Sequence, residues 1–189
     1  MNHPSKEWSN TRIVAACLSG DERAWSALLE RYKNLIYSIP LRYGAPPQDA
    51  ADIFQAVCLD LFNELPRLRD AEALQGWLIR VTTHKCYHWK RRQLSQESGL
   101  ADDQLETVTA LHAMAPDLLL EVEREQAVRE AIADLPPRCR EMIELLFFEQ
   151  PPMPYNDVAR RLELATGSIG FIRGRCLKRL KKLLEQKGF

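Results

Sequence analysis

Residues 71–92, AEALQGWLIRVTTHKCYHWKRR, form a predicted helix whose two faces differ in chemistry. At about 100° per residue, an apolar stripe collects Leu74, Trp77, Leu78, Val81 and Trp89. A second stripe collects Arg80, Thr83, His84, Tyr87 and Arg91. Arginines neutralise phosphates and aromatic rings stack on unpaired bases, so the second stripe suits a nucleic-acid partner. The same pattern also fits an amphipathic helix with a solvated basic face, and the surrounding chain has to separate the two interpretations.

The chain before this helix is also predicted to be helical. A short helix over residues 10–19 precedes Asp21, which is placed to cap the next helix. That second helix repeats apolar residues at three- and four-residue spacing as far as Ile39, and Pro40 is expected to kink or end it. A third helix is expected over residues 48–65. No strand-like alternation of apolar and polar residues occurs here, so this block is predicted to be all-α.

The third helix has an acidic outer face. Its apolar residues, which include Phe54 and Phe62, are expected to face inward. The residues expected to lie outward or on the flanks are Asp49, Asp52, Gln55, Asp60 and Glu64. Such a face is often merely solvated, so by itself it identifies no partner.

Charge is unevenly distributed along the 189 residues, although lysines and arginines balance aspartates and glutamates overall. Residues 1–95 carry a net charge of +3, residues 96–134 carry −8 and residues 135–189 carry +5. Two basic blocks around an acidic connector are typical of a nucleic-acid-binding protein.

The acidic connector also marks a boundary between domains. Residues 93–115 are rich in Ser, Gln, Asp, Thr and Ala with weak periodicity, and they are long for a connection inside one compact domain. We therefore predict two small helical domains joined by an acidic flexible linker, with the first domain at 1–94, the linker at 95–117 and the second domain at 118–189.

The second basic block contains a predicted helix-turn-helix. Helices are expected over residues 155–162 and 167–184, in the arrangement whose second helix enters the major groove of DNA. The basic face of that second helix carries Ser168, Phe171, Arg175, Lys178 and Lys182. Arg173 falls beside the apolar stripe instead, where it either reaches a phosphate or pairs with an acidic neighbour.

Several other functions find no support in the sequence. No apolar run is long enough to span a bilayer, and no phosphate loop, nucleophile motif or carboxylate pair indicates an enzyme or a cofactor. The five cysteines are scattered without a CxxC pair, which predicts reduced thiols in a cytoplasmic protein. His84 and His88 share a helix face, but Cys86 falls about 160° from either, so no metal site is predicted.

Four segments, in order, resemble the extracytoplasmic-function group of bacterial RNA polymerase sigma factors. They are CLSGDERAWSALLERYKNLIYSIPLRYG (17–44), DIFQAVCLDLF (52–62), GWLIRVTTHKCYHWKRR (76–92) and LPPRCREMIELLFFEQPPMPYNDVARRLELATGSIG (135–170). The second is similar to the family's DxxQ polymerase-binding helix, and the third to its promoter-facing WLxRIxxNxxxDxxRR helix. The fourth is similar to the family's helix-turn-helix block.

This resemblance implies a sigma factor that binds core RNA polymerase, directs it to promoter DNA and helps to melt the minus-ten element. The residues implied to contact the clamp coiled coil of the polymerase are Asp49, Asp52, Gln55 and Asp60. The residues implied to hold the melted minus-ten element are Arg67, Leu68, Arg69, Arg80, Thr83, His84, Tyr87 and Arg91. The residues implied to contact the minus-thirty-five duplex are Ser168, Phe171, Arg175, Lys178 and Lys182. An anti-sigma factor is an expected further partner.

The sequence also departs from the family pattern in its second domain. Glu163 stands where the family often has glycine in the turn, and Gly170 and Ile172 lack the Lys and Arg common at those positions. The alternative interpretation is a free-standing helix-turn-helix regulator, which would leave the basic helix at 71–92 and the acidic helix face without a task.

Overall fold

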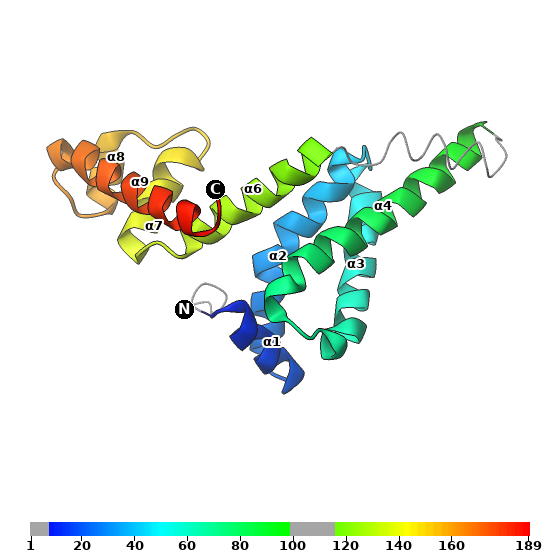
Figure 1. Ribbon diagram of the computed structural model, residues 1–189. Helices are drawn as coiled ribbons and strands as arrows, with labels where there is room; N and C mark the ends of the chain where they lie inside the picture. The colour runs from blue at the N-terminus through cyan, green and yellow to red at the C-terminus, as the bar shows by residue number, and fades with distance from the viewer. Residues whose placement is uncertain (1–7, 99–115) are drawn as a thin grey trace. The chain divides into compact units, whose positions relative to one another are not determined.

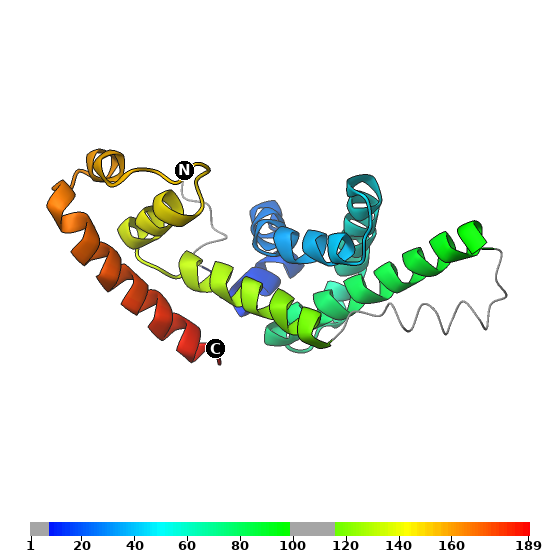
Figure 2. The same ribbon diagram turned by 90° about the horizontal axis from the view of Figure 1, so that it is seen from above.

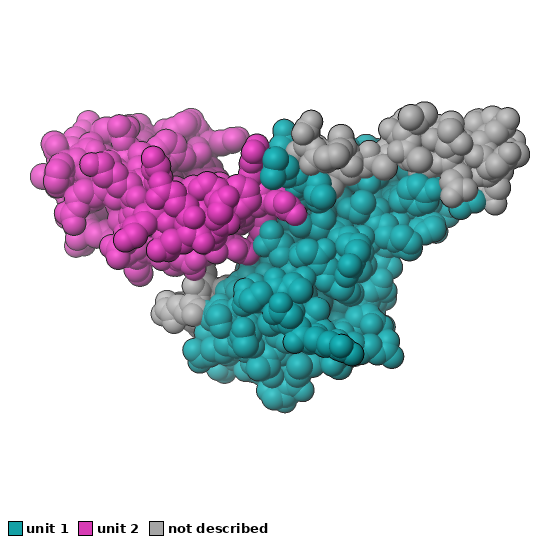
Figure 3. Space-filling view, viewed as in Figure 1, with its two compact units in different colours: residues 1–122 teal, residues 123–189 magenta. Residues whose placement is uncertain are grey.

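The computed structural model describes residues 8–98 and 116–189, and all regular secondary structure in these two stretches is helical (Figure 1). The predicted all-α class is therefore confirmed. The chain forms two compact units, Met1–Val122 and Glu123–Phe189 (Figure 3). The division falls inside helix α6 (Pro116–Ala133), whereas the sequence placed its second domain from residue 118. Most of the predicted linker at 95–117 lies outside the described residues.

The first unit is a bundle of four helices joined by short turns. Its elements are α1 (Asn10–Leu18), α2 (Glu22–Arg42), α3 (Pro47–Glu64), the 3₁₀ turns η2 (Leu65–Arg67) and η3 (Ala71–Ala73), and α4 (Leu74–Ser98), and the first part of α6 adds Val122 to its core. Helix α2 packs against α1, α3 and α4 (Figures 1 and 2). As predicted, the Asp21 side chain caps α2 by accepting a hydrogen bond from the backbone N–H of Arg23 at 2.8 Å.

Apolar residues from all four helices build the core of this unit. Leu28 and Leu35 of α2, Val57 of α3 and Leu78 of α4 are among its fully buried side chains. Burying a Leu or Val side chain stabilises a fold by about 1.5–3 kcal/mol relative to leaving it exposed. The helix periodicity in the sequence therefore identified the faces that meet in the bundle.

One expectation for this unit is narrowed and two need correction. Of the two effects expected of Pro40, a kink or an end, the structure excludes an end at Pro40, because Pro40 is buried within α2 and the helix continues to Arg42. Phe62 does not face inward: its side chain is 63% exposed and its ring lies 5.4 Å from that of Trp25. Helix α4 extends beyond residue 92 to Ser98, since no Gly or Pro interrupts it before Gly99.

The second unit contains the predicted helix-turn-helix. Its elements are the later part of α6, α7 (Pro137–Phe147), α8 (Tyr155–Arg161), the 3₁₀ turn η4 (Thr166–Ser168) and α9 (Ile169–Gln186). Met142 of α7, Val158 of α8 and Ile169 of α9 are fully buried together in its core. Arg138 of α7 donates a 2.8 Å hydrogen bond to the carbonyl oxygen of Leu162, which ties α7 to the end of α8.

A disulfide bond joins α7 to α9. Cys139 and Cys176 are covalently linked, with their Cα atoms 5.3 Å apart, while Cys17, Cys58 and Cys86 are free. The expectation that all five cysteines are reduced thiols is therefore wrong. The two bonded residues are separated by 37 positions, so only the packing of α9 on α7 brings them together.

Candidate functional site

Helix α4 presents its basic and aromatic residues on the face opposite its buried stripe. Arg80 and His84 are exposed, and Tyr87 and Arg91 are half-buried. The backbone of α4 is fixed by Leu74 and Leu78, which are fully buried in the first unit. Thr83 is an exception, because its hydroxyl oxygen is buried and has no hydrogen-bond partner among the described residues.

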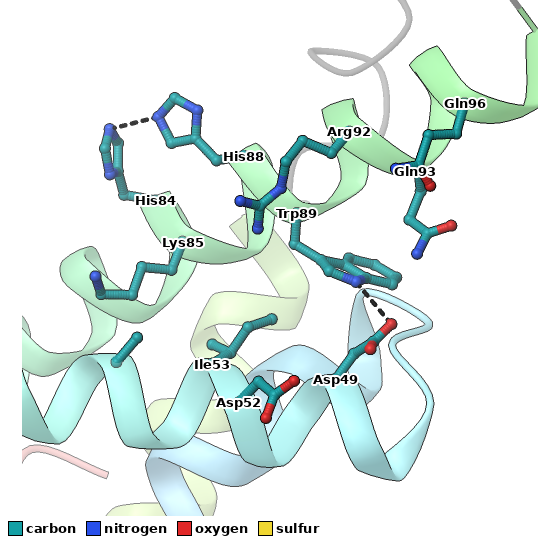
Figure 4. A pocket seen from close by; sticks show the side chains of 11 residues that line it. Asp49, Asp52, Ile53, His84, Lys85, His88, Trp89, Arg92, Gln93 and Gln96 are labelled. Carbon is teal, nitrogen blue, oxygen red and sulfur yellow. Dashed lines mark hydrogen bonds between the residues drawn. The ribbon is translucent and has the colours of Figure 1, made fainter.

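His84 and His88 form a pair on successive turns of this face. Their Nε2 atoms lie 3.1 Å apart and their ring centroids 4.4 Å apart (Figure 4). One nitrogen must donate and the other accept, so the contact is lost when both rings are protonated. Partial desolvation of the largely exposed ring and the neighbouring His84, Arg91, Arg92 and Lys85 lower the pKa of His88 below its ordinary value of 6.5.

A pocket of about 490 Å³ lies between this part of α4 and α3. Asp49 and Asp52 of α3 lie on one side, and His84, His88 and Arg92 of α4 lie on the other (Figure 4). Acidic groups thus line one wall and basic or titratable groups the other. The pocket is therefore suited to a polar partner that meets both helices.

Two of the four predicted polymerase-facing residues have partners in α4. Asp49 is half-buried and accepts a 2.9 Å hydrogen bond from Nε1 of Trp89 (Figure 4). Asp60 forms a 2.7 Å ion pair with Nζ of Lys85. Both contacts hold α4 on α3. Asp52 and Gln55 are exposed on α3, where a partner can reach them.

The loop before α4 carries the remaining residues predicted to receive promoter DNA. Arg67 and Arg69 are exposed, and Arg67 pairs with Glu64 at 2.7 Å. Leu68 is half-buried against the core of the first unit. Asp70 caps the turn that leads into α4 by accepting a 2.9 Å hydrogen bond from the backbone N–H of Glu72. The loop is therefore held in place by Leu68 and Asp70, while the side chains of Arg67 and Arg69 are exposed to solvent.

Helix α9 presents the second predicted surface. Phe171, Arg175, Lys178 and Lys182 are exposed on it, whereas Ile169 and Cys176 are buried on its opposite face. Ser168 is half-buried, and its hydroxyl donates a 2.6 Å hydrogen bond to the carbonyl oxygen of Ala165. A helix with one buried face and one basic face is the arrangement that a major groove admits.

The anomalous arginine of α9 has an internal partner. Arg173 donates a hydrogen bond to the Tyr155 hydroxyl, and its guanidinium carbon lies 5.8 Å from the centroid of the Tyr155 ring. The sequence predicted that Arg173 contacts a phosphate or an acidic neighbour, whereas in the structure its partner is Tyr155, the first residue of α8. Arg173 thus joins the two helices of the helix-turn-helix.

The possible metal ligands on α4 do not converge. Cys86 is buried in the core, where burial raises the pKa of its thiol to about 12, while His84 and His88 are exposed. Across the stretches that the structure describes, no group of three His, Cys, Asp or Glu side chains could hold a metal ion. No helix in those stretches is both long and apolar enough to cross a membrane.

Several residues of the pocket wall were not predicted from the sequence. His88, Arg92, Gln93 and Gln96 line the pocket but were not among the predicted site residues. Gln93 and Gln96 lie in the part of α4 that the predicted helix left out. The spacing of His88 and Arg92, four and eight residues after His84, could have indicated the shared face.

Comparison with known proteins gives matches over both units. Residues 28–95 match the family model described as Sigma-70 region 2, a span that contains most of α2, all of α3 and most of α4. The RNA polymerase sigma-H factor of Pseudomonas aeruginosa is 26% identical over 165 residues, which cover 84% of each chain.

A second group of relatives gives longer matches. The ECF RNA polymerase sigma-E factor of Escherichia coli (strain K12) is 24% identical over 172 residues, covering 87% of this chain and 88% of the relative. The sigma-E factor of Salmonella typhimurium (strain LT2) matches with the same identity and coverage. The similarity therefore extends well beyond the segment matched by the family model.

Proposed function

The chain belongs to the extracytoplasmic-function group of RNA polymerase sigma factors, which direct the polymerase to promoters, and we propose how its two units divide that work. The first unit binds core polymerase and holds the melted minus-ten element. The second unit reads the minus-thirty-five element as duplex DNA. Proteins of this family are not enzymes in their own right, and their partners are core RNA polymerase and promoter DNA.

In this proposal, α3 contacts the clamp coiled coil of the polymerase through Asp52 and Gln55. Both side chains are exposed on one face of a helix whose opposite face is buried. Asp49 and Asp60 do not contact the polymerase directly in this proposal, because Trp89 and Lys85 already bind their carboxylates. They position α4 relative to the polymerase-binding helix.

The basic and aromatic face of α4 holds the non-template strand after melting. Arg80 supplies positive charge for phosphates, and His84 and Tyr87 supply rings for stacking on unpaired bases. The exposed arginines Arg67 and Arg69 border the loop that would receive a flipped base. Thr83 is not assigned a DNA contact, because its hydroxyl oxygen is buried.

One observation carries this proposal: within a single helix bundle, direct contacts join α3, on which Asp52 and Gln55 are exposed, to α4, on which Arg80 and His84 are exposed beside the half-buried Tyr87. A protein that only bound operator duplex would need neither face. The free-standing regulator remains the alternative, since α8 and α9 alone would suffice for it.

The test of the function is transcription in a purified system. The chain mixed with core polymerase should give run-off transcripts from specific promoters, and neither component alone should do so.

Asp52→Ala and Gln55→Ala should weaken capture of core polymerase, while Glu30→Ala, which removes an exposed acid on α2, serves as the matched control. Tight binding of a specific duplex by the chain alone, without core-dependent transcripts, would favour the regulator.

Two finer assignments complete the proposal. The protein acts in the cytoplasm, where its polymerase partner is found. An anti-sigma factor that covers the polymerase-binding or DNA-binding face would hold it inactive. Co-purification from cells before and after stress would detect such a factor as a stoichiometric partner.

A further inference from the structure

We propose that Phe171 is a specificity-determining residue that reads the 5-methyl group of a thymine in the upstream duplex element, with Arg175 holding its ring. This inference rests on the proposed function of α9 as the duplex reader. It adds which chemical group on the DNA the helix recognises.

Phe171 is the most exposed large hydrophobic side chain in the described part of the protein, at 71%. It lies in the first turn of α9, where a recognition helix contacts base edges. Leaving a Phe side chain in water forfeits the free energy that its burial would provide. A partner that covers the ring would recover that free energy.

The face that carries Phe171 is otherwise basic. Arg175, Lys178 and Lys182 follow at four, seven and eleven residues, within about 40° of Phe171 around the helix. All three are exposed, so the ring stands among groups that attract phosphates. The charge around Phe171 therefore favours DNA over an apolar protein groove as its partner.

Only one group on a base pair matches this ring in the major groove. A phenyl ring has no hydrogen-bond donor or acceptor, so it cannot recognise the polar edges of guanine, cytosine or adenine. The 5-methyl group of thymine is the apolar group on that edge, and contact with Phe is one of its known modes of recognition. Stacking would need unpaired bases, which an intact duplex does not offer.

Arg175 limits the freedom of the ring. Its guanidinium carbon lies 5.9 Å from the centroid of Phe171, at cation–π distance. A ring held in this way loses less conformational freedom on binding, which favours discrimination. Arg175 is a positioning residue for the thymine contact, in addition to any contact of its own with DNA.

The glycines beside Phe171 fit a close approach to an external ligand. A Cβ atom added at Gly170 or Gly174 would meet nothing within 4 Å, so packing inside the protein does not require their small size. In a helix interior each glycine costs about 1 kcal/mol relative to alanine, and glycine is favoured where a backbone and a ligand come close. Gly170 and Gly174 lie about 100° and 60° around the helix from Phe171, so they leave α9 open on one flank of the ring.

Deoxyuridine substitution tests the inference directly, because it removes only the methyl group. Holoenzyme assembled from the full chain and core polymerase is bound to promoter fragments chosen from mapped transcript starts. Each thymine of the upstream element is replaced singly by deoxyuridine. At one position, wild-type affinity should fall about fourfold, which corresponds to ~0.8 kcal/mol for one buried carbon group.

The protein variants identify the residue that senses the methyl group. Phe171→Ala should bind the thymine promoter about fourfold more weakly and should show no further loss with deoxyuridine. Phe148→Ala, which removes a 61% exposed ring elsewhere in the same unit, should keep the full deoxyuridine effect. Arg175→Gln should reduce that effect, since the ring is no longer held. Thermal melting would check that each variant is folded.

Three results would overturn the inference. They are an upstream element with no thymine on either strand, a wild-type holoenzyme indifferent to every deoxyuridine, and a Phe171→Ala holoenzyme that keeps the wild-type deoxyuridine loss. Core-dependent transcripts in any of these cases would leave the proposed function intact. Absence of such transcripts from the wild-type chain would instead contradict the proposed function.

Discussion

Glu163 adopts a left-handed backbone conformation, with φ of 53°, at the end of α8. The helix ends at Arg161, and the N–H of Leu164 returns to the carbonyl oxygen of Ala159 at 2.8 Å. This is the usual way to close a helix, and glycine is the residue that normally does it. A side chain at this position costs about 1–2 kcal/mol, because its Cβ crowds the following carbonyl.

Glu163→Gly should therefore raise the free energy of unfolding of the second unit by about 1 kcal/mol. The gain is reduced by the larger entropy that glycine gives to the unfolded chain. Urea unfolding measures the difference. Ala165→Gly is the matched control, since Ala165 has an ordinary φ of −70° and should lose stability when replaced. A destabilised Glu163→Gly variant would show that the glutamate side chain has a stabilising contact.

His88 is a residue whose protonation should oppose folding. Partial desolvation and nearby positive groups lower its pKa below 6.5, so as the pH falls the unfolded chain binds a proton before the folded chain does. Stability should therefore decrease as the pH falls from about 6.5 to the folded pKa, and His88→Gln should remove this loss.

Nuclear magnetic resonance of the histidine rings measures this directly. His88 should titrate below 6.5, and His84→Gln should move its pKa upward, because the neighbouring ring contributes to the shift. A His88 that titrates at or above 6.5 in the wild-type chain would contradict the geometry of the pair.

At the scale of elements, α4 is held on α3 by specific polar contacts as well as by packing. The hydrogen bond from Trp89 to Asp49 joins residues 40 positions apart and its acceptor is a carboxylate.

Trp89→Phe keeps most of the ring and removes the hydrogen-bond donor, so it should lower the stability of the first unit by about 1–2 kcal/mol. Asp52→Asn, three residues along the same helix but exposed, is the control and should change stability little. Equal stability of Trp89→Phe and wild type in urea unfolding would count against this positioning role.

The disulfide between α7 and α9 is the second link between elements. Closing a loop between residues 37 positions apart should stabilise the second unit by about 4 kcal/mol in the chain-entropy model. Reductant, or the double change Cys139→Ser and Cys176→Ser, should lower the midpoint temperature of unfolding of the second unit. The first unit is the internal control, since its three cysteines are free.

Counting free thiols tests whether the Cys139–Cys176 disulfide forms. Alkylation of the unfolded, unreduced protein followed by intact mass measurement should show three modified cysteines and two protected ones. Five modified cysteines would contradict the bond.

Most of the elements could be predicted from the sequence, because helix faces follow a local period. The stripes of α2 and α4 and the cap at Asp21 need only neighbouring residues to be recognised. Contacts between distant residues could not be predicted in this way. The partners of Asp49, Asp60 and Arg173, and the disulfide, depend on how the helices pack, because these pairs lie 18 to 40 positions apart and carry no local signal of their contact.

At the scale of the whole molecule, the two units differ in the form of DNA that each is proposed to bind. We propose that the first unit holds unpaired DNA on α4 and that the second reads duplex DNA on α9. Each assignment rests on residues within one unit, so variants of each surface should fail at different steps of initiation.

Permanganate reactivity of promoter thymines, measured beside duplex binding in the same holoenzyme preparations, is the most direct test of this division. Arg80→Ala with His84→Ala should retain initial promoter binding and lose the reactivity of melted thymines by tenfold or more, since the charge-assisted contact of Arg80 contributes ~1.5–3 kcal/mol and the stacking of His84 adds to it. Lys178→Ala with Lys182→Ala should lose initial binding, and reactivity should return when promoter is saturating. Equal loss of both steps in both variants would contradict the separation of melting and duplex reading between the two units.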